Sequence, residues 1–354
     1  MTFAAGSGRH AIKSMVALLL ALAAGLAVPG AAQAHGPVNP VASDYLARVS
    51  QVPAGLAVKV VDGDQAMWLR APASTTVVVL DPRGAPYLRF SAAGEAVNQN
   101  SELYYLNQTP VALTPPPGLS AATPTDWHRV SSGHSYLWHE GRLHALAALA
   151  ISPSTSYVGR WTVPVLVDGR RTVIAGGVWH TGAPSLAWLW PIVVLVLSLL
   201  AVRRLRDPVL DRRAVLALGL TTLLGIALAA AGRDLHGRPG ISAFGAAELA
   251  VTLALVAWAT WRLLGARVGF LLGFAIAFVG LYEGIVVFPA LDHGYVLLAL
   301  GPLVGRLSAV LCLGGGIGLL LSALRVADTA DTGETGDPDQ DDIEEDFGVA
   351  PSLG

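Results

Sequence analysis

The chain has 354 residues, of which 53% are hydrophobic and only 14% are charged. Its mean hydropathy of +0.55 is too high for an ordinary water-soluble protein, so the composition predicts a membrane protein. Basic residues lie beside apolar runs rather than in a patch with aromatic side chains, which gives no indication of nucleic-acid binding. The single cysteine, Cys312, excludes an intrachain disulfide, a thiolate zinc site and an iron–sulfur cluster.

Residues 1–34 have the pattern of a signal peptide. Basic residues precede the apolar run 15–28, and Ala32 and Ala34 are the small residues that a signal peptidase reads. We therefore expect the mature chain to begin at His35. The alternative is an uncleaved first membrane helix.

Residues 35–181 are predicted to form an extracytoplasmic all-β domain. Short β-branched runs are separated by turn dipeptides, of which Asp62-Gly63 and Asp168-Gly169 favour the positive φ angles of a type I′ hairpin. The expected strands are 56–61, 65–70, 75–80, 86–90, 160–167 and 170–174. Seven or eight strands at this spacing predict an immunoglobulin-like sandwich, with the Pro-rich stretch 110–124 as a crossover.

Residues 182–325 are predicted to form a bundle of five transmembrane helices. The apolar runs are 186–202, 214–231, 241–261, 268–288 and 297–324. Each is long enough to cross a hydrocarbon core of about 30 Å. Arginines follow the first, third and fifth runs, so the positive-inside rule makes those ends cytoplasmic and agrees with a secreted N-terminal domain. Gly314 and Gly318 predict close helix packing.

The tail 326–354 holds ten of the 25 acidic residues of the chain and no basic residue. Such a segment buries too little apolar surface to offset its ordering entropy. We expect it to be disordered in the cytoplasm, as a solvated tail or as a docking segment.

All eight histidines of the expected mature chain lie on the outer side in this topology. Histidine is the commonest metal ligand where thiols are absent. His35 would chelate through both its α-amine and its ring, an arrangement that suits Cu(II). His134, His139 and His144 lie in one segment, where Gly141 is expected to break the strand and bring His139 and His144 together. The alternative is a half-exposed strand whose aromatic residues pack and whose charges pair locally.

The ectodomain resembles that of a group of actinobacterial membrane proteins without an assigned activity. The matching motifs are Pro86-Tyr87-Leu88-Arg89, Tyr105-Leu106-Asn107 and Trp138-His139-Glu140-Gly141-Arg142-Leu143-His144. The resemblance covers about residues 50–145 and implies a signal peptide, a β-rich ectodomain with a W-H-[DE]-x-R-x-H motif, and C-terminal membrane helices. This chain departs from that pattern, because Gly141 replaces a second histidine and Ala145 replaces a tryptophan. An N-terminal His35 before a β-sandwich is also similar to periplasmic copper-resistance chaperones and to the copper subunit of particulate methane monooxygenase.

Three ionisable residues within the apolar runs form a predicted intramembrane polar cluster: Glu248, Glu283 and Arg306. Charges in a bilayer are costly unless they are paired or functional. The cluster is either a structural bridge between three helices or a substrate or ion site. Polar residues of the outer loops, His236, Asp292 and His293, would lie just above it.

No nucleophile elbow, phosphate loop, H-E-x-x-H or paired-carboxylate motif is present, so we do not expect an enzyme. The sequence favours an envelope protein that binds a metal ion, most plausibly copper, through ectodomain histidines. The alternative is a non-catalytic structural or interaction protein whose sandwich docks an extracellular partner. A transporter is a third hypothesis, weakened by the absence of a broken-helix repeat. The bilayer is an expected partner, and nucleic acid and nucleotides are not.

Overall fold

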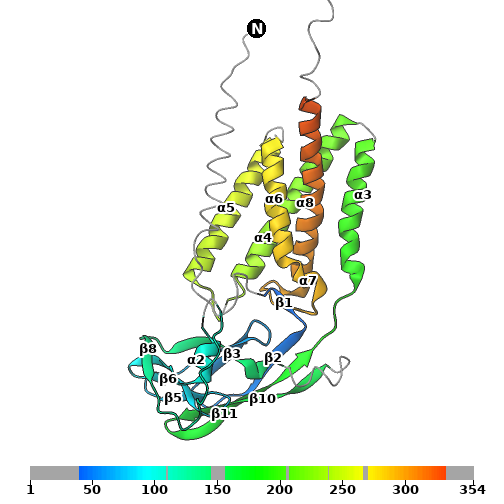
Figure 1. The fold of residues 1–354 in the computed structure, drawn as a ribbon. Helices are drawn as coiled ribbons and strands as arrows, with labels where there is room; N and C mark the ends of the chain where they lie inside the picture. The colour runs from blue at the N-terminus through cyan, green and yellow to red at the C-terminus, as the bar shows by residue number, and fades with distance from the viewer. Residues whose placement is uncertain are drawn as a thin grey trace, which may run out of the picture.

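The computed structural model describes residues 40–108, 111–144, 156–204, 207–237, 239–265 and 270–331. The predicted signal peptide, His35 and the tail beyond Asp331 lie outside these residues. A β-rich region is followed by a helical region, and the two lie end to end, with the sheets below one end of the helices (Figure 1).

The β-rich region contains two open antiparallel sheets. The larger has the order β2-β11-β10-β5-β6-β7-β8, and the smaller has the order β3-β4-β9. The strand bounds are β2 Tyr45–Gln51, β3 Ala57–Val61, β4 Ala66–Arg70, β5 Val77–Leu80, β6 Pro86–Ser91, β7 Gly94–Asn98, β8 Trp127–Ser131, β9 Ser135–His139, β10 Tyr157–Val167 and β11 Arg170–His180. The predicted β-rich region is confirmed, but the sheets do not close into the expected immunoglobulin-like sandwich.

The two sheets share one apolar core. Met67 and Trp138 of the small sheet belong to the same buried cluster as Phe90, Val163 and Ile174 of the large sheet. Their alternation along each strand follows from the two-residue repeat of a β-strand, which sends every second side chain to the same face. The short helix α2, Glu102–Leu106, adds Leu103 to this core.

The turn predictions are confirmed where glycine or aspartate adopts a positive φ. Asp62 and Gly63 have φ angles of 61° and 79° between β3 and β4, and Asp168 and Gly169 have 48° and 80° between β10 and β11. Asp168 and Gly169 form the two-residue loop of a type I′ hairpin, since Val167 pairs with Arg170, whereas Asp62 and Gly63 begin a four-residue loop between Val61 and Ala66. Between β5 and β6, the buried Asp81 accepts hydrogen bonds from the backbone amides of Arg83 and Ala85, which fixes that turn.

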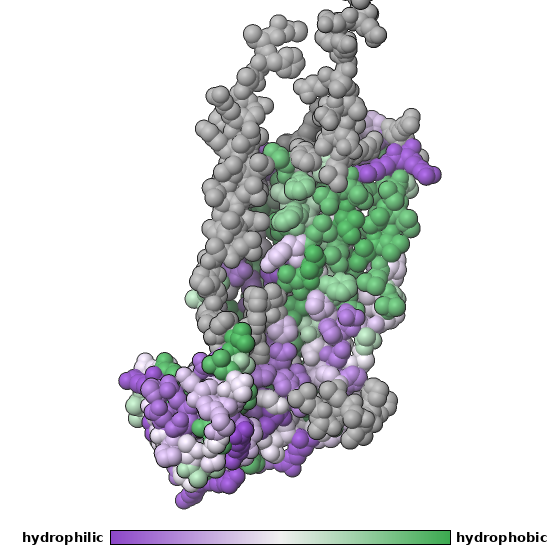
Figure 2. Space-filling view, viewed as in Figure 1, coloured by the Kyte–Doolittle hydropathy of each residue, from purple (hydrophilic) through white to green (hydrophobic). Residues whose placement is uncertain are grey.

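The helical region contains α3 Trp190–Arg204, α4 Pro208–Asp234, α5 Ala243–Gly265, α6 Phe270–Val287, α7 Pro289–Asp292 and α8 Gly301–Asp331. Among the described residues, four helices are long and apolar enough to cross a membrane, namely 186–204, α4, α5 and 301–323. The apolar α6 is shorter. Figure 2 shows apolar side chains over the helices and polar side chains over the β-rich region.

Small residues allow α8 to pack closely against its neighbours, as the glycine spacing predicts. A methyl group on Gly314 would overlap Leu195 of α3, and one on Gly318 would lie 2.9 Å from Leu218 of α4. Close backbone approach through glycine is a common source of helix association in bilayers.

The β-rich region is joined to the bundle by more than the covalent chain. Strand β1, Ala42–Ser43, pairs with β12, Tyr295–Val296, in the loop between α7 and α8. The backbone amide of Leu297 donates to the carbonyl of Val41 over 2.8 Å, and Lys59 Nζ donates to the carbonyl of Pro239 over 3.1 Å. These bonds hold the sheets against the loops at one end of the helices.

Two glycines of strands β10 and β11 allow the packing of the large sheet to be tested. A Cβ on Gly176 would overlap the carbonyl oxygen of Arg48 and the Trp161 ring, whereas one on Gly159 would meet open space. We expect Gly176→Ala to lower the free energy of unfolding by about 1–3 kcal/mol, since overpacking displaces neighbouring strands. Gly159→Ala, the matched control, should change it by less than about 1 kcal/mol. Thermal unfolding of the detergent-solubilised chain measures both, and equal effects would contradict the packing.

Candidate functional site

The motif segment 138–144 lies where the chain leaves β9 and enters the short 3-10 helix Gly141–Leu143. Trp138 is 2% exposed and Glu140 has no exposed surface, so alternate residues of the segment point into the core. His139 points the other way. The predicted strand over 134–144 therefore ends at His139, and Gly141 begins the turn, as the sequence suggested.

Glu140 is the centre of a buried polar network. Its carboxylate accepts two hydrogen bonds from the Arg142 guanidinium, over 2.7 and 2.6 Å, and a third from Trp138 Nε1 over 3.0 Å. Arg142 also donates to the carbonyl of Leu80 at the end of β5. The charged pair is thus neutralised and tied to the neighbouring sheet, which is the arrangement that a buried carboxylate requires.

His139 and His144 are brought together by this turn, as expected. Their rings lie 5.0 Å apart between centroids, and the two Nε2 atoms face each other at 3.4 Å. Asp64, from the turn between β3 and β4, contacts His144 Nδ1 through Oδ2 at 3.2 Å. Asp64 is 8% exposed, so a buried carboxylate fixes the orientation of the His144 ring through Nδ1. The result is an Asp–His–His chain in which each contact is within hydrogen-bond distance.

The backbone of His139 is fixed independently of its ring. Asn107, which follows helix α2, accepts a hydrogen bond from the His139 amide over 2.7 Å and donates one to its carbonyl over 3.2 Å. This double contact occupies the edge of β9, so His139 is held on a rigid element. Rigid support of this kind sets the position of a side chain better than a free loop does.

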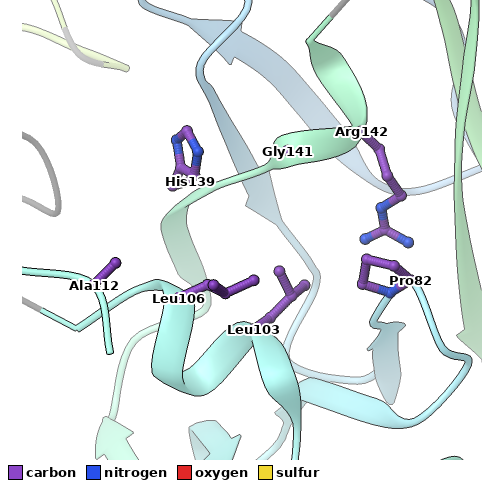
Figure 3. Close-up of a pocket in the computed structure, with 7 residues that line it drawn as sticks. All are labelled: Pro82, Leu103, Leu106, Ala112, His139, Gly141 and Arg142. Carbon is purple, nitrogen blue, oxygen red and sulfur yellow. The ribbon is translucent and has the colours of Figure 1, made fainter. Parts of the chain in front are cut away.

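An open groove of about 490 Å³ lies beside His139. Figure 3 shows His139 and Arg142 on either side of Gly141, with the apolar side chains of Leu103 and Leu106 below them. A side chain added at Gly141 would meet no atom within 4 Å. The groove therefore has room for a ligand of His139.

The other predicted metal ligands do not join the pair. His134 precedes the start of β9 and His139 is its last residue, so the extended strand separates them by about 16 Å. His134 instead lines a second depression with Arg70 and Pro72, where its Nδ1 is buried without a hydrogen-bond partner. His35 lies outside the described residues. Within the described ranges, no group of three or more metal-ligating side chains is present.

Two tyrosines near this network stay protonated at neutral pH. Burial raises the pKa of Tyr87 well above its ordinary value, and the nearby Tyr136 and Glu140 raise it further. Burial also raises the pKa of Tyr136, with a smaller contribution from Glu95. Neither phenol is therefore an anionic ligand, and the nitrogen atoms of the histidines are the available donors.

The intramembrane charges pair differently from the sequence-based expectation. Glu283 of α6 is bound through both oxygens by Arg233 of α4, over 2.5 and 3.1 Å. Arg306 instead donates to the carbonyls of Ala290, His293 and Gly294. The predicted contact between Arg306 and Glu283 is thus absent among the ion pairs of the described residues. Arg233, near the end of α4, pairs with Glu283 instead. Glu248 is exposed on α5.

Among the outer-loop residues, His293 is part of the contact between the two regions. Its Nδ1 lies 3.0 Å from Asp44 Oδ2, and the amide of Gly294 donates to the other Asp44 oxygen. Asp292 is exposed and His236 is partly buried. These three residues lie at or just after helix ends, and they do not line a common pocket among those of the described residues.

Asp64 and Arg233 are the site residues that sequence reasoning missed. Asp64 follows a turn dipeptide and reads as a solvated turn residue, and no local spacing connects it to His144, 80 residues later. Arg233 lies just beyond the apolar run 214–231, so it reads as a loop residue. Helix α4 extends to Asp234, however, and carries Arg233 inside the bundle. The position of Arg233 within one helical turn of the apolar run was the sequence feature that could have identified it as a partner of an intramembrane carboxylate.

Comparisons of the chain with protein-family models, curated proteins and solved structures found no significant match. The resemblance to actinobacterial membrane proteins therefore stays a hypothesis. The coarser pattern that it implies, a β-rich N-terminal region before long apolar helices, is present.

The Glu140 network makes a quantitative prediction. Arg142→Met would leave the Glu140 carboxylate buried and unpaired, so it should reduce the free energy of unfolding by about 3–5 kcal/mol. The matched control is Arg83→Met, because Arg83 pairs with Glu102 but is 49% exposed. That change should cost about 0–1 kcal/mol. Denaturant titration followed by tryptophan fluorescence measures both, and a small loss for Arg142→Met would show that the network is unimportant.

The membrane ion pair is tested by double-mutant cycles with leucine. Arg233→Leu combined with Glu283→Leu should give an interaction energy of about 0.5–3 kcal/mol, because the two side chains are in contact. Arg306→Leu combined with Glu283→Leu should be additive within about 0.5 kcal/mol. Unfolding of the chain in mixed micelles supplies the energies. Strong coupling of Arg306 with Glu283 would instead restore the sequence-based cluster.

Proposed function

We propose that the chain is an integral membrane protein of the cell envelope that crosses the bilayer five times. Helix α6 is the fifth span, in addition to the four longer helices. Its 18 residues extend about 27 Å, close to the thickness of a hydrocarbon core. Its packing beside α8, where Gly316 meets Leu281, supports the same assignment. An odd number of spans places the β-rich region and the C-terminal tail on opposite sides.

Arginines support an extracytoplasmic β-rich region. Arg204, Arg212 and Arg262 lie at the end of the bundle away from the sheets. Positive charge beside membrane spans is a mark of the cytoplasmic side. The signal peptide expected at residues 1–34 agrees with this orientation, and cleavage before His35 is part of the proposal.

We further propose that the β-rich region binds a transition-metal ion through His139 and His144. The observation that carries this proposal is the 3.4 Å separation of the facing Nε2 atoms. Two nitrogens bound at 2.0–2.1 Å to one tetrahedral Zn²⁺ lie about 3.3 Å apart. The pair is therefore spaced for one shared ion, and in the metal-free chain the same two atoms are within hydrogen-bond distance of each other.

Asp64 supports the same assignment as a positioning residue. A metal-binding histidine commonly donates its second ring N–H to a carboxylate, which fixes the tautomer and raises the basicity of the ligand nitrogen. Asp64 lies at Nδ1 of His144, so Nε2 is the nitrogen left for the metal. Water, or a donor from another molecule in the groove, would complete the coordination.

Copper is the metal that the sequence favoured, through His35, and it is tested beside zinc. Cu²⁺ binds nitrogen donors more tightly than the other divalent ions of the first transition row. Zinc suits the nitrogen spacing. The proposal concerns the binding of either ion, and we propose no enzymatic step.

A second candidate function is the docking of an envelope protein. Leu106 is 40% exposed, Leu113 52% and Val111 69%, and they lie on or near the rim of the groove beside His139. Exposed apolar residues that cluster in this way often mark an interaction surface. Metal content of the purified chain separates this candidate from the first.

Titration of Zn²⁺ and Cu²⁺ into the full-length, detergent-solubilised chain tests the metal site. We expect one site that is lost in His139→Ala and His144→Ala, and an affinity about 10–100-fold lower in Asp64→Asn. Because a protonated imidazole does not bind metal, affinity should fall as the pH is lowered through about 6.

The matched control is His128→Ala, because His128 also lies beside a carboxylate, Asp126, at 3.2 Å but has no second histidine. It should bind as the wild type does. Gly141→His should raise the affinity, since that position has room and borders the same groove. Absence of binding, or binding that survives loss of both His139 and His144, would refute the metal site.

A further inference from the structure

A group of exposed arginines surrounds the end of the bundle away from the β-rich region. Its members are Arg204 at the end of α3, Arg212 and Arg213 in the first turns of α4, and Arg262 near the end of α5. We name these four residues the arginine collar. Figure 1 shows the corresponding ends of α3, α4, α5 and α8 at the same end of the molecule.

The collar is compact because one apolar cluster gathers the four helix ends. Leu199 of α3, Leu218 of α4 and Leu263 of α5 pack in the same buried cluster as Leu319 of α8. Each of the first three residues lies within about five positions of a collar arginine. Arg204, Arg212 and Arg213 therefore lie on helices that pack against α8, and Arg262 lies on α5, which packs against α4.

The collar has unused positive charge. Within the described ranges, its four guanidinium groups have no hydrogen bond or ion pair. Of the two nearby acids, Asp207 already accepts the amides of Val209 and Leu210 as the cap of α4, and Asp211 is also engaged. The exposed arginines are thus open to an external anion.

The chain carries its own anion next to this position. Helix α8 ends at Asp331, and residues 332–354 contain eight acidic residues and no basic one. The densest run, Asp341-Asp342-Ile343-Glu344-Glu345-Asp346, begins ten residues beyond the helix. Ten extended residues span up to about 33 Å, which exceeds the sum of the roughly 18 Å by which α8 extends beyond Leu319 and the roughly 8–10 Å between neighbouring helix axes.

We infer that residues 332–354 dock on the arginine collar and compete there with anionic lipid headgroups. Attachment to α8 gives the tail an effective concentration in the millimolar range at the collar, so weak ion pairs are enough to populate the contact. A phosphate headgroup offers the same charge, but the tail is present in every molecule and in every lipid. The docked tail prevents the collar from binding anionic lipid. Release of the tail exposes the collar arginines and the acidic residues of the tail.

A spin label on the tail tests this inference in the full-length chain. Cys312 is fully buried, so Thr335→Cys supplies a single reactive thiol. In nanodiscs of phosphatidylcholine at 0.1 M NaCl, we expect a slow component in the spectrum of the label. The component should disappear at 1 M NaCl, because the Debye length falls from about 10 Å to about 3 Å.

Variants assign the slow component to the collar. Arg212→Gln with Arg213→Gln should abolish it, and Asp341→Asn with Asp342→Asn, Glu344→Gln and Glu345→Gln should do the same. The matched control is Arg170→Gln with Arg171→Gln, which removes two exposed arginines of the β-rich region and should leave it unchanged. Unchanged thermal unfolding midpoints show that the variants fold.

Lipid composition distinguishes the two anions. Phosphatidylglycerol in the nanodiscs should reduce the slow component by competition, which supports the inference. A label that is fully mobile in phosphatidylcholine at 0.1 M NaCl would overturn it. So would a slow component that persists in Arg212→Gln with Arg213→Gln. If the tail is mobile and this pair of changes only reduces retention of phosphatidylglycerol, the collar is a lipid site.

Discussion

A carboxylate without contact to water sets the geometry of the candidate site. Glu140 would cost several kcal/mol if it were buried alone, so the chain must bring Arg142 and Trp138 Nε1 to it. That requirement turns the backbone through Gly141 immediately after β9. The turn places His144 beside His139. The position of the two histidines therefore depends on the packing of Glu140 in the core.

The motif thus divides by side-chain direction rather than by sequence position. Trp138 and Glu140 point inward, Arg142 pairs with Glu140 and stabilises the turn, and His139 lines the groove. The two histidine rings contact each other, His144 also contacts Asp64, and neither ring belongs to the apolar core. A change at His139 or His144 should therefore affect ligand binding more than folding.

Features encoded within a few residues were predictable, and features that depend on distant pairing were not. Asp62-Gly63 and Asp168-Gly169 specify their hairpins because the required φ angles restrict the residue types. Apolar runs specify the helices because a bilayer leaves no other way to satisfy the backbone. The pairing of β1 with β12 joins residues about 250 positions apart. Neither segment carries a local pattern that names its partner, and the same holds for Asp64 with His144.

The error at Arg306 shows where reasoning by depth along a helix fails. Glu283 and Arg306 lie at similar distances from the loop between α6 and α8, which made them candidate partners. Helix α7 occupies this loop, however, and Arg306 binds the carbonyl of Ala290 in α7 and those of His293 and Gly294 just after it. A guanidinium with several donors is satisfied by such carbonyls, since each bond to a charged donor is stronger than a neutral one. Glu283 then needs another cation, and Arg233 on the neighbouring α4 is within reach. Arg306 therefore stabilises the loop that contacts Asp44 of the β-rich region. Helix α8 thus positions the sheets at one end and carries the acidic tail at the other.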